Sequence, residues 1–464
     1  RLRAGAIALR IVAARPGGDA CGAGTDEGRM TVSATIANER AVLADSLWTA
    51  TANPTPDRPA LSGEAEADVV VIGGGFTGLS AALHLAERGV DVALLEAETP
   101  GWGASGRNGG QVNPGLKAKP AETEARFGPD LGRRMVALSG GAGDLVFDLI
   151  ERHGVSCDAN RCGWLRAAYN DAGLADLREA GRQWRERGHA VDELDAAAME
   201  RLVGAPGYRG GLIDRRGGNL HPLNYALGLA DAAERLGARL HGHSRALDIR
   251  SDADSVTVTT RGGRVTAGRA LVCTNAYTRD LGAPLGRTVV PVTSVQAATA
   301  PLSPNVAASI LPEGHAVSDT RRLLVYFRKD AAGRFLIGGR GALGDRGIAA
   351  KQAGLRETAA ALFPQLSGVA WTHAWGGNVA MTRDHAPGLH RIAPRVMAGL
   401  GFNGRGVGMA TAMGTVLADW ASGKPEAELD FPVTEARPIP FHRFRRIGVG
   451  ATVALFRALD RLGR

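Results

Sequence analysis

Apolar and polar residues alternate along the 464-residue chain in blocks that predict strands and helices in turn. The run 69–72 is continuously apolar and the run 90–95 is largely apolar, so both are interpreted as buried strands. Between them, segment 76–89 places leucines and small alanines at the spacing of a helix that packs against a sheet. Residues 68–95 therefore predict a strand, a helix and a second strand.

Comparable units recur in the middle and at the end of the chain. Pro222 can occupy the first turn of a helix that extends to Leu236, and short strands follow it. An apolar strand at 395–401 leads through glycines into a helix at 407–421. The other predicted elements are helices at about 130–152 and 171–188, strands at 246–250, 255–260, 264–267 and 270–273, and a strand-rich stretch at 285–340 with a hairpin of 323–328 and 334–339.

This interleaving predicts an α/β fold in which a Rossmann-like domain is threaded through a second domain with a mixed antiparallel sheet. The Arg-rich residues 1–29 precede Met30 and resemble a transit peptide without its serines, and we expect no folded role for them. Residues 31–67 are polar and dotted with prolines, and we expect them to lie over the surface. The expected divisions are an N-terminal extension and lead-in at 1–67, the Rossmann-like domain at 68–127, 215–283 and 375–425, the second domain at 128–214 and 284–374, and a basic C-terminal tail at 426–464.

The net charge of +8 could indicate a nucleic-acid partner, but its location argues against one. Residues 437–464 contain seven Arg against one Asp, a net +6, so most of the excess lies in the tail. Aromatic residues are not interleaved with the basic ones as in RNA-binding proteins. No run approaches the ~18 apolar residues of a membrane span. The tail is a partly amphipathic helical pattern, which predicts docking on the protein's own surface or contact with an anionic membrane.

The four cysteines form no C-x-x-C pair and have no cluster of histidines beside them, so we expect no metal site. Reduced thiols in a cytoplasmic protein are the simplest interpretation. A disulfide between Cys157 and Cys162 is the alternative.

The first predicted strand ends in the glycine spacing Gly73-x-Gly75-x-x-Gly78. Such glycines make a tight turn, let the backbone approach a pyrophosphate, and let the following helix pack closely on the strand. Glu96 ends the second strand, about 20 residues later, where a carboxylate accepts hydrogen bonds from ribose hydroxyls. Because strand, turn, helix, strand and acid occur in register, this segment predicts a dinucleotide site.

A second glycine-rich loop, 101–115, follows Glu96 closely enough to pass along the far half of a long dinucleotide. Its glycines permit close backbone approach, and its polar side chains supply donors to a phosphate or a flavin ring. A flexible surface loop is the alternative interpretation. The residues expected to contact a cofactor here are Ser105, Arg107, Asn108, Gly109, Gly110 and Gln111.

A third glycine-rich turn, 399–406, precedes the helix at 407–421. The N-terminus of that helix would stabilise an anion, such as the charge that a reduced flavin carries near N1 and C2=O. A purely structural turn is equally compatible with the sequence. The residues expected to contact the cofactor here are Gly401, Asn403, Gly404 and Gly406.

Taken together, these motifs resemble those of the D-amino-acid-oxidase-like FAD-dependent oxidoreductases, and within them the gamma-glutamylputrescine oxidoreductase type. The resemblance covers about residues 45–445. It rests on VVVIGGGFTGLSAALHLAERG at 69–89, GASGRNGGQ at 103–111, ALVCTNAYT at 270–278, WGGNVAMTRDHAPG at 375–388 and GFNGRGVGMATAMG at 401–414.

The resemblance implies FAD, with its adenosine end on Gly73 to Gly78 and Glu96 and its isoalloxazine near 105–111 and 401–406. It also implies an amine or amino-acid substrate that loses a hydride to flavin N5. The imine then hydrolyses, and O2 or another electron acceptor reoxidises the flavin. This chemistry needs an aligned, uncharged amine beside the flavin and no catalytic triad.

The chain departs from the family pattern at one informative place. Amino-acid oxidases of this family carry an Arg just after the Trp-x-Gly strand, where it binds the substrate carboxylate, but here Trp375 and two glycines are followed by Asn378. That change removes the obvious bidentate anchor and favours an amine, such as a polyamine derivative, over an α-amino acid. Arg383 or Arg328 could substitute if either faced the pocket.

Four residues are candidates for contact with the substrate: Trp375, Asn378, His221 and His385. A buried Trp is more often part of a core, a histidine at a helix start often makes a structural hydrogen bond, and His385 could belong to a salt-bridged loop. Three other functions stay open: an NAD(P)-dependent dehydrogenase, an FAD-dependent amino-acid oxidase or dehydrogenase, and an accessory flavoprotein that passes electrons to a partner.

Overall fold

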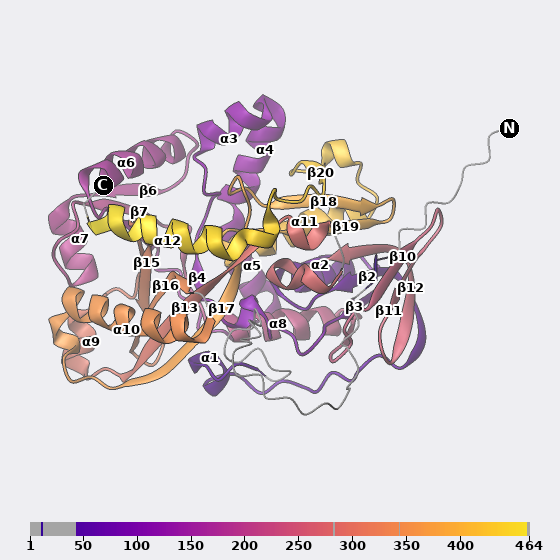
Figure 1. The fold of residues 1–464 in the computed structure, drawn as a ribbon, viewed down its shortest axis with the longest axis horizontal. Coiled ribbons are helices and arrows are strands. Elements are labelled where there is room, and N and C mark those ends of the chain that lie inside the picture. The colour runs from indigo at the N-terminus through magenta and orange to yellow at the C-terminus, as the bar shows by residue number, and fades with distance from the viewer. Residues whose placement is uncertain (1–10, 13–42, 282–283, 343, 462–464) are drawn as a thin grey trace, which may run out of the picture.

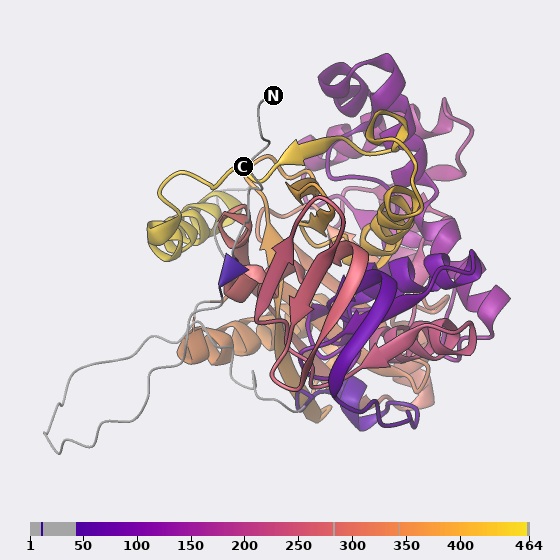
Figure 2. The same ribbon diagram turned by 90° about the vertical axis from the view of Figure 1, so that its right-hand side faces the viewer.

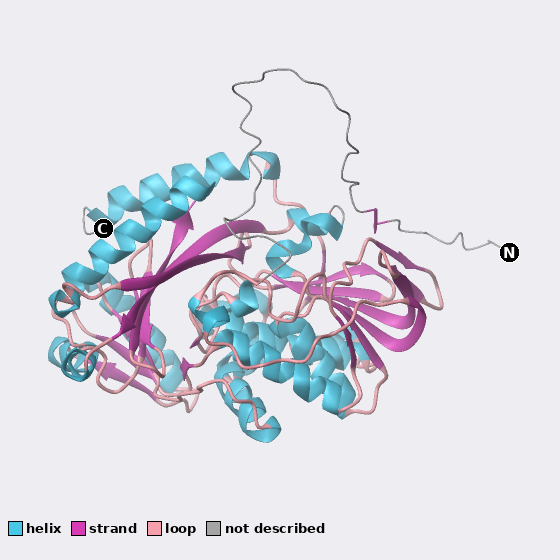
Figure 3. Cartoon of the chain, turned by 90° about the horizontal axis from the view of Figure 1, so that it is seen from below, coloured by secondary structure: helices cyan, strands magenta, loops and turns pink. Residues whose placement is uncertain are grey.

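The computed structural model describes residues 11–12, 43–281, 284–342 and 344–461, and their strands form sheets of ten, eight and two strands. The ten-stranded sheet and the eight-stranded sheet gather at opposite ends of the longest axis of the molecule, with helices packed on their faces (Figures 1 and 3). The predicted α/β fold with a second, largely antiparallel sheet is therefore confirmed.

Five parallel strands form the centre of the ten-stranded sheet, with β2 in the middle of the order. In that order they are β9 (Arg239–His241), β3 (Val92–Leu95), β2 (Gly63–Ile72), β12 (Gly263–Val272) and β19 (Val396–Leu400). Side chains of β2 alternate between two cores: Val69 and Val71 face the helices, whereas Val70 and Ile72 face the opposite layer. A strand buried on both faces explains the uninterrupted apolar run in the sequence.

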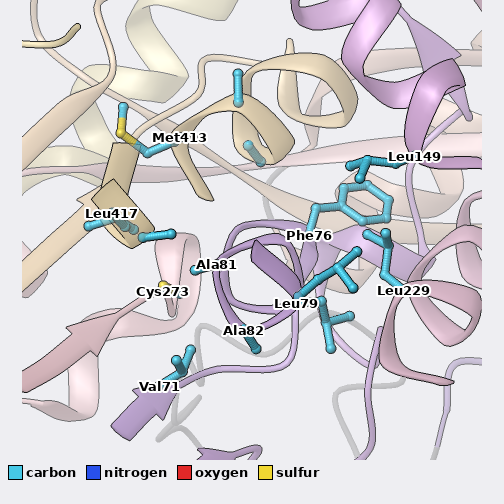
Figure 4. Close-up of a cluster of buried hydrophobic side chains, with 14 of the residues drawn as sticks. Val71, Phe76, Leu79, Ala81, Ala82, Leu149, Leu229, Cys273, Met413 and Leu417 are labelled. Atoms are coloured by element: carbon cyan, nitrogen blue, oxygen red, sulfur yellow. The ribbon is translucent and has the colours of Figure 1, made fainter. Parts of the chain in front are cut away.

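Three helices cover one face of this sheet: α2 (Phe76–Glu87), α8 (Pro222–Arg235) and α11 (Gly406–Ala421). Figure 4 shows Phe76 and Leu79 of α2 beside Leu229 of α8, with Met413 and Leu417 of α11 elsewhere in the same core cluster. Glycine permits the close crossing of α11 over α2, because a Cβ at Gly414 would lie 2.5 Å from Cβ of Ser80. All three helices lie within two residues of their predicted bounds.

The opposite face carries a layer of antiparallel strands, β10 (Asp248–Ser251), β11 (Val256–Thr259) and the first half of β12 (Figure 2). The sequence predicted separate strands at 264–267 and 270–273, but the structure joins them in β12. The first half of β12 pairs with β11 and the second half pairs with β19, so this strand has two different partners along its length. The short strand β1 (Ile11–Val12) pairs with β10, so these two residues of the extension do have a partner.

The eight-stranded sheet is antiparallel except where β5 meets β14. The predicted hairpin is confirmed as β15 and β16. In sheet order the strands are β17 (Trp371–Met381), β13 (Val290–Pro301), β16 (Arg334–Ala342), β15 (Val325–Lys329), β14 (Ala316–Asp319), β5 (Trp164–Ala167), β7 (Gly211–Asp214) and β6 (Val191–Leu194). A two-stranded sheet of β4 (Gln111–Val112) and β8 (Gly218–Asn219) lies between the larger sheets.

The predicted helix at 130–152 is two helices, α4 (Pro129–Gly140) and α5 (Ala142–His153), which meet at Gly141. Both pack into the same core as α2 and α11, so the predicted division at residue 128 does not coincide with a change of core. Strand β17 likewise pairs within the eight-stranded sheet, although the sequence assigned 375–381 to the Rossmann-like domain. The remaining elements are α3 (Pro120–Phe127), α6 (Asp171–Arg185), α7 (Ala196–Val203), α9 (Pro304–Ser309), α10 (Gly344–Leu362), β18 (Gly388–Ala393) and β20 (Val433–Glu435).

Part of the lead-in is buried, contrary to the expectation that it lies over the surface. Ser46 caps the short helix α1 (Leu47–Ala50), and Trp48 is 1 % exposed. Leu47 and Trp48 pack with side chains from α8 and from the eight-stranded sheet. The lead-in therefore contributes to the core between the two sheets.

The tail ends in α12 (Arg445–Arg461), which contacts β16. Asp460 accepts hydrogen bonds from the backbone N–H groups of Arg322 and Leu323, and His442 bonds to the carbonyl of Val289. Ile447 and Leu455 are exposed. None of the helices in the described ranges is long and apolar enough to cross a membrane. Contact between the tail and a membrane surface stays a prediction.

Three of the four cysteines, Cys157, Cys162 and Cys273, lie in the described ranges, and all three are free thiols. The alternative disulfide between Cys157 and Cys162 is therefore wrong for this structure. Cys21 lies outside the described residues.

Candidate functional site

The glycine turn lies at the carboxyl ends of the parallel strands, where the direction of strand succession reverses. Strands β3 and β9 lie on one side of β2, and β12 and β19 lie on the other, so a ligand crevice is expected beside β2. Gly73 has a φ of +107°, which favours glycine, and its N–H donates to the carbonyl of Leu95. A Cβ at Gly78 would lie 2.0 Å from the carbonyl oxygen of Gly73. Both glycines are thus required by the turn itself.

The start of α2 has the features of an anion site. Its N-cap is Gly75, which has no side chain, and the first turn contains no acidic residue. The N–H of Phe76 donates to Oγ of Ser105 at 3.0 Å, so the second glycine-rich loop reaches this helix start. Free N–H groups and the helix dipole at such a start favour phosphate oxygens.

Glu96 is held beside the same turn. Its Oε2 accepts from the N–H of Gly74 at 2.6 Å, and its Oε1 accepts from the N–H of Glu98 at 2.9 Å. Burial raises the pKa of Glu96, while these two backbone hydrogen bonds act to lower it. The carboxyl group is therefore fixed in orientation where the fingerprint places a ribose-binding acid.

Arg107 is the clearest candidate for contact with a bound ligand. It is 2 % exposed, its Nε donates to the carbonyl of Trp102 at 2.9 Å, and its guanidinium stacks on the Trp102 ring at 4.6 Å. Nη1 and Nη2 are buried and have no hydrogen-bond partner among the residues that the structure describes. A buried cation without partners is costly, so an anion or a carbonyl-rich ring is expected to bind there.

The loop that carries Arg107 is held by the eight-stranded sheet. The carbonyl of Arg107 accepts hydrogen bonds from Nε1 of Trp375 at 2.9 Å and from Nε2 of Gln296 at 2.5 Å. Nε1 of Trp48 donates to the carbonyl of Asn108 at 2.8 Å. The sequence analysis missed Gln296 and Trp48. The Ser46 cap followed by Leu47 and Trp48 was the available signal for the latter.

Two predicted contacts of this loop have other roles. Nδ2 of Asn108 donates to the carbonyls of Ala104 and Ser105, so this side chain shapes its own loop. Gln111 donates through Nε2 to the carbonyl of Val317 and accepts from Oγ of Ser318. Short polar side chains commonly bond to nearby backbone in this way, so these bonds give Asn108 and Gln111 a role in shaping the loop.

Gly109 and Gly110 are needed for packing. A Cβ at Gly109 would lie 2.9 Å from the ring of Tyr326, and one at Gly110, where φ is +66°, would lie 2.0 Å from the carbonyl oxygen of Leu220. The carbonyl of Gly109 accepts from Nε of Arg328 at 2.6 Å. The two glycines let the loop pass between β15 and the start of α8.

The third turn leaves the N-terminus of α11 open. The Asn403 side chain is hydrogen-bonded within the protein: its Nδ2 donates to the carbonyl of Gly401 at 2.6 Å and its Oδ1 accepts from the N–H of Thr382 at 2.9 Å. Gly401 and Gly404 have φ values of +84° and +86°. A Cβ at Gly406 would meet no described atom within 4 Å, and the helix start has no side-chain cap. This helix start therefore has room for a ligand.

The two predicted histidines lie apart from one another. His221 is buried as the N-cap of α8: its Nδ1 accepts from the N–H of Asn224 at 3.1 Å, and its Nε2 is 3.0 Å from Oγ1 of Thr51. Burial, and next the nearby charge of Arg328, lower the pKa of His221 to about 4. His385 is exposed at a turn. His221 thus has a structural role as a neutral cap.

Strand β17 carries no arginine or lysine that could take the place of the carboxylate-binding arginine of the amino-acid oxidases. Trp375 is buried against Trp48 with ring centroids 5.8 Å apart, and Asn378 is buried opposite Thr293. Every guanidinium nitrogen of Arg328 donates to a carbonyl oxygen or to Asn219, and burial lowers the pKa of Arg328 to about 10. Arg383 is exposed. Arg328 is therefore already fully hydrogen-bonded within the protein, whereas Arg383 lies at the surface.

A pocket of about 260 Å³ adjoins this region. It includes Pro114, three residues after Gln111, and Arg405, the N-cap residue of α11. Its other charged lining residues include Arg166 from β5 and Asp214 from β7. This pocket could not be predicted from the sequence, because its lining comes from elements far apart in the chain.

One protein family, several curated proteins and several solved structures are similar to this chain. The family described as FAD dependent oxidoreductase (DAO) matches residues 68–420. The gamma-glutamylputrescine oxidoreductase of Escherichia coli (strain K12) is 35 % identical over 421 residues, which cover 90 % of this chain and 98 % of that protein. The glycine oxidase of Geobacillus kaustophilus (strain HTA426) is 26 % identical over 370 residues, covering 78 % and 94 %.

A solved structure of glycine oxidase from Geobacillus kaustophilus superimposes with a TM-score of 0.65 at 24 % identity, covering 78 % of this chain and 96 % of that one. The structure of L-proline dehydrogenase from P. horikoshii gives a TM-score of 0.65 at 20 % identity, covering 79 % and 96 %. At these identities the likeness shows the fold alone.

Proposed function

The chain belongs to the family of DAO-type FAD-dependent oxidoreductases, and we propose that it oxidises a C–N bond of an amine, with a gamma-glutamylated polyamine as the preferred substrate class. FAD is its cofactor. The NAD(P)-dependent alternative is therefore excluded. The residues that fit FAD are Glu96 and the start of α2 for the adenosine half, and Arg107 and the start of α11 for the remainder.

One observation carries the proposed substrate class: β17 presents Asn378 where amino-acid oxidases of this family have an arginine. An α-amino acid has its carboxylate on the carbon that is oxidised, so its binding needs a cation next to that carbon. Arg328 is committed to backbone carbonyls, and Arg383 is exposed. An amine without a carboxylate on the reacting carbon needs no such cation.

Bound FAD supplies a two-electron acceptor for the hydride of the carbon that bears the nitrogen. The chain's own residues bind and orient. The backbone N–H groups at the starts of α2 and α11 favour negative charge on the ligand, and Glu96 accepts from hydroxyl groups. The contacts of Trp375 and Gln296 with the carbonyl of Arg107 fix the loop that faces the ligand. The released imine hydrolyses in water, and we propose O2 as the electron acceptor.

Anaerobic titration of the purified holoenzyme tests this function. We expect gamma-glutamylputrescine to bleach the flavin absorbance in the visible range, and we expect glycine and other α-amino acids to do so at least tenfold less efficiently. Admission of air should restore the colour and release H2O2. Equal or better bleaching by an amino acid would make the protein an amino-acid oxidase, which is the second candidate.

Two other outcomes identify the remaining alternatives. Bleaching by an amine without recovery in air would indicate an acceptor other than O2. Holoenzyme that no amine bleaches would indicate an accessory flavoprotein that passes electrons to a partner.

A further inference from the structure

The pocket beside α6 and the start of α11 contains one charged side chain, Arg166, that has no hydrogen bond or ion pair with the residues that the structure describes. Its floor is formed by β5 and β7, and α6 covers it. At about 260 Å³, it is smaller than the ~300–1,000 Å³ of pockets that enclose a whole drug-sized ligand. It therefore suits one end of a substrate. The lining residues are Pro114, Leu116, Lys117, Ala118, Lys119, Glu122, Trp164, Arg166, Asp176, Ala180, Trp184, Val191, Leu212, Asp214 and Arg405.

The strand register places Arg166 in the floor of this pocket. Trp164 lies opposite Asp214, and Arg166 lies opposite Leu212. Residues two apart on a strand share a face, so these four side chains face the same side of the sheet. The intervening Leu165 packs into the core on the other face. Arg166 thus projects into the pocket because its neighbour projects into the core.

The other charged groups of the lining are largely neutralised by protein partners. Asp214 accepts from Nε and Nη2 of Arg216 at 2.9 and 2.6 Å. Lys119 lies 2.5 Å from Asp176 and 3.3 Å from Glu122. These pairs leave little free charge of either sign at their positions.

The two arginines of the lining differ in their hydrogen bonding: Arg405 is bonded to described protein groups, whereas Arg166 is not. Nη1 of Arg405 donates to the carbonyls of Pro114 and Gly115 at 2.8 and 3.1 Å. The guanidinium of Arg166 stacks on the ring of Trp164 at 5.4 Å, and within the described part of the chain it has no hydrogen bond and no ion pair. Burial lowers the pKa of Arg166, while the nearby carboxylates of Asp176 and Asp214 act to raise it.

The pocket lies beside the predicted flavin end but away from β17. Pro114 continues the loop that carries Arg107, and Arg405 directly precedes Gly406 at the start of α11. No residue of β17 lines the pocket among those described. A carboxylate bound here would thus be separate from the position on β17 where the amino-acid oxidases carry their carboxylate-binding arginine.

We propose that Arg166 binds a carboxylate at the end of the substrate remote from the oxidised amine, so that the preferred substrates are amines acylated by a carboxylate-bearing group. This inference rests on the proposed amine oxidation and deepens it. A γ-glutamyl group carries such a carboxylate, and the planar guanidinium is suited to bind it through two parallel hydrogen bonds. Arg166 is therefore a specificity-determining residue, distinct from the groups that bind FAD.

A matched pair of substrates tests the proposal on the holoenzyme: γ-glutamylputrescine and 4-aminobutanoylputrescine, which differ only by the carboxylate. We expect Arg166→Met to lower kcat/KM for γ-glutamylputrescine by about 10- to 100-fold, mainly through KM, because a charged hydrogen-bonded pair is lost. The value for 4-aminobutanoylputrescine should stay within about threefold. Arg166→Lys should recover part of the loss.

Arg209→Met serves as the matched control, since Arg209 is exposed and lies 3.7 Å from Asp171. It should leave both values unchanged. The proposal is overturned if the wild type uses the two substrates equally, or if Arg166→Met lowers both values equally at normal FAD content.

A binding measurement separates this proposal from the proposed function. γ-Glutamylbutylamide keeps the carboxylate but lacks the amine that would be oxidised, so calorimetric titration reports its affinity without turnover. We expect Arg166→Met to weaken this affinity about 10- to 100-fold, with no change for 4-aminobutanoylbutylamide. If the wild type oxidised no amine, the proposed function would fail, and this titration would still decide whether Arg166 binds the carboxylate. Equal affinities of the wild type and Arg166→Met for γ-glutamylbutylamide would overturn the inference.

Discussion

Arg107 shows how a single buried side chain reports a ligand. Its terminal nitrogens are buried without partners in the described chain, whereas its Nε and its carbonyl are bonded. The positive charge of Arg107 is therefore not neutralised by a described protein group at these two nitrogens. Glu96 is likewise buried beside the glycine turn, but two backbone N–H groups fix the orientation of its carboxyl group.

Arg107→Met should weaken FAD binding and leave the apoprotein intact. Loss of a charged hydrogen-bond donor predicts a rise in the FAD dissociation constant of about 10- to 100-fold. The thermal midpoint of the apoprotein should stay the same or rise, because a buried unpartnered charge is removed. FAD titration of apoprotein and a thermal melt measure the two effects, with Arg209→Met as the control. Unchanged FAD affinity would show that Arg107 is structural only.

His221 predicts a dependence of stability on pH. Its folded pKa of about 4 lies below the ordinary 6.5, so between these values the unfolded chain binds the proton and the folded chain does not. The contribution to stability is therefore complete above pH 6.5 and is lost as the pH falls toward 4. The loss amounts to roughly 3 kcal/mol.

Replacement of His221 by Asn keeps a capping side chain but removes the titration. The free energy of unfolding of His221→Asn, measured with urea at pH 7.5 and pH 5, should fall less on acidification than that of the wild type. His243→Asn is the control, because His243 is exposed and asparagine tolerates its positive φ. Equal slopes for the wild type and His221→Asn would contradict the prediction.

Some residue roles could be predicted from sequence and others could not. Gly73 and Gly78 occupy a turn whose geometry follows from local sterics, so their spacing was sufficient to predict the turn. Asn108, Gln111 and Asn403 share the same glycine-rich surroundings, yet their side chains bond to protein groups. The choice between ligand and backbone depends on which acceptors fold into reach, and composition does not show that.

At the scale of elements, α1 links the lead-in to the glycine-rich loop at 101–111. Trp48 packs edge-on against His221 and Trp375, lies 5.0 Å from the guanidinium of Arg328, and bonds to the carbonyl of Asn108. One side chain thus contacts α8, two strands of the eight-stranded sheet and the loop at 101–111. A segment that reads as polar and irregular in sequence has a central position in the fold.

Trp48→Ala should destabilise the protein by about 3–5 kcal/mol, because it leaves a large cavity in a closed core. Trp48→Phe retains most of the ring and loses the hydrogen bond to Asn108, so it should cost about 1 kcal/mol. Urea unfolding of the holoenzyme measures both. The half-exposed Leu236→Ala is the control and should cost less than either. A loss below 1 kcal/mol for Trp48→Ala would show that α1 is not part of the core.

Helices with a clear apolar period were predicted well, whereas strand limits depended on partners. The bounds of α2, α8 and α11 follow from glycines, Pro222 and the spacing of their apolar residues. Strand β12 was predicted as two strands because its middle is polar and contains Gly268. Pairing with β2 along its whole length makes it continuous, and that pairing is a long-range property.

At the scale of the whole molecule, the proposed cofactor site draws on both large sheets. The glycine turn and Glu96 follow strands of the ten-stranded sheet, while Gln296 and Trp375 of the eight-stranded sheet hold the loop of Arg107. FAD is therefore expected to stabilise the two parts together.

Removal of FAD should lower the thermal midpoint of unfolding as one cooperative transition. A ligand at 1,000 times its dissociation constant stabilises the folded state by about 4 kcal/mol. Differential scanning calorimetry of apoprotein and holoenzyme measures the shift, and addition of FAD to the apoprotein should restore it. Two separate transitions, only one of which responds to FAD, would show that the two sheets unfold independently.

The sequence by itself determined the family, the cofactor and the βα units that bind it, since glycine sterics, apolar periodicity and the position of Glu96 all act over short stretches of chain. Only the tertiary structure decided which polar groups are free. It commits Arg328 to carbonyls of two distant segments and buries Trp48 beneath the loop. It leaves the terminal nitrogens of Arg107 and the guanidinium of Arg166 without hydrogen-bond partners among the described residues. Whether a charge is satisfied depends on groups that the fold brings from far along the chain, and no local pattern records them.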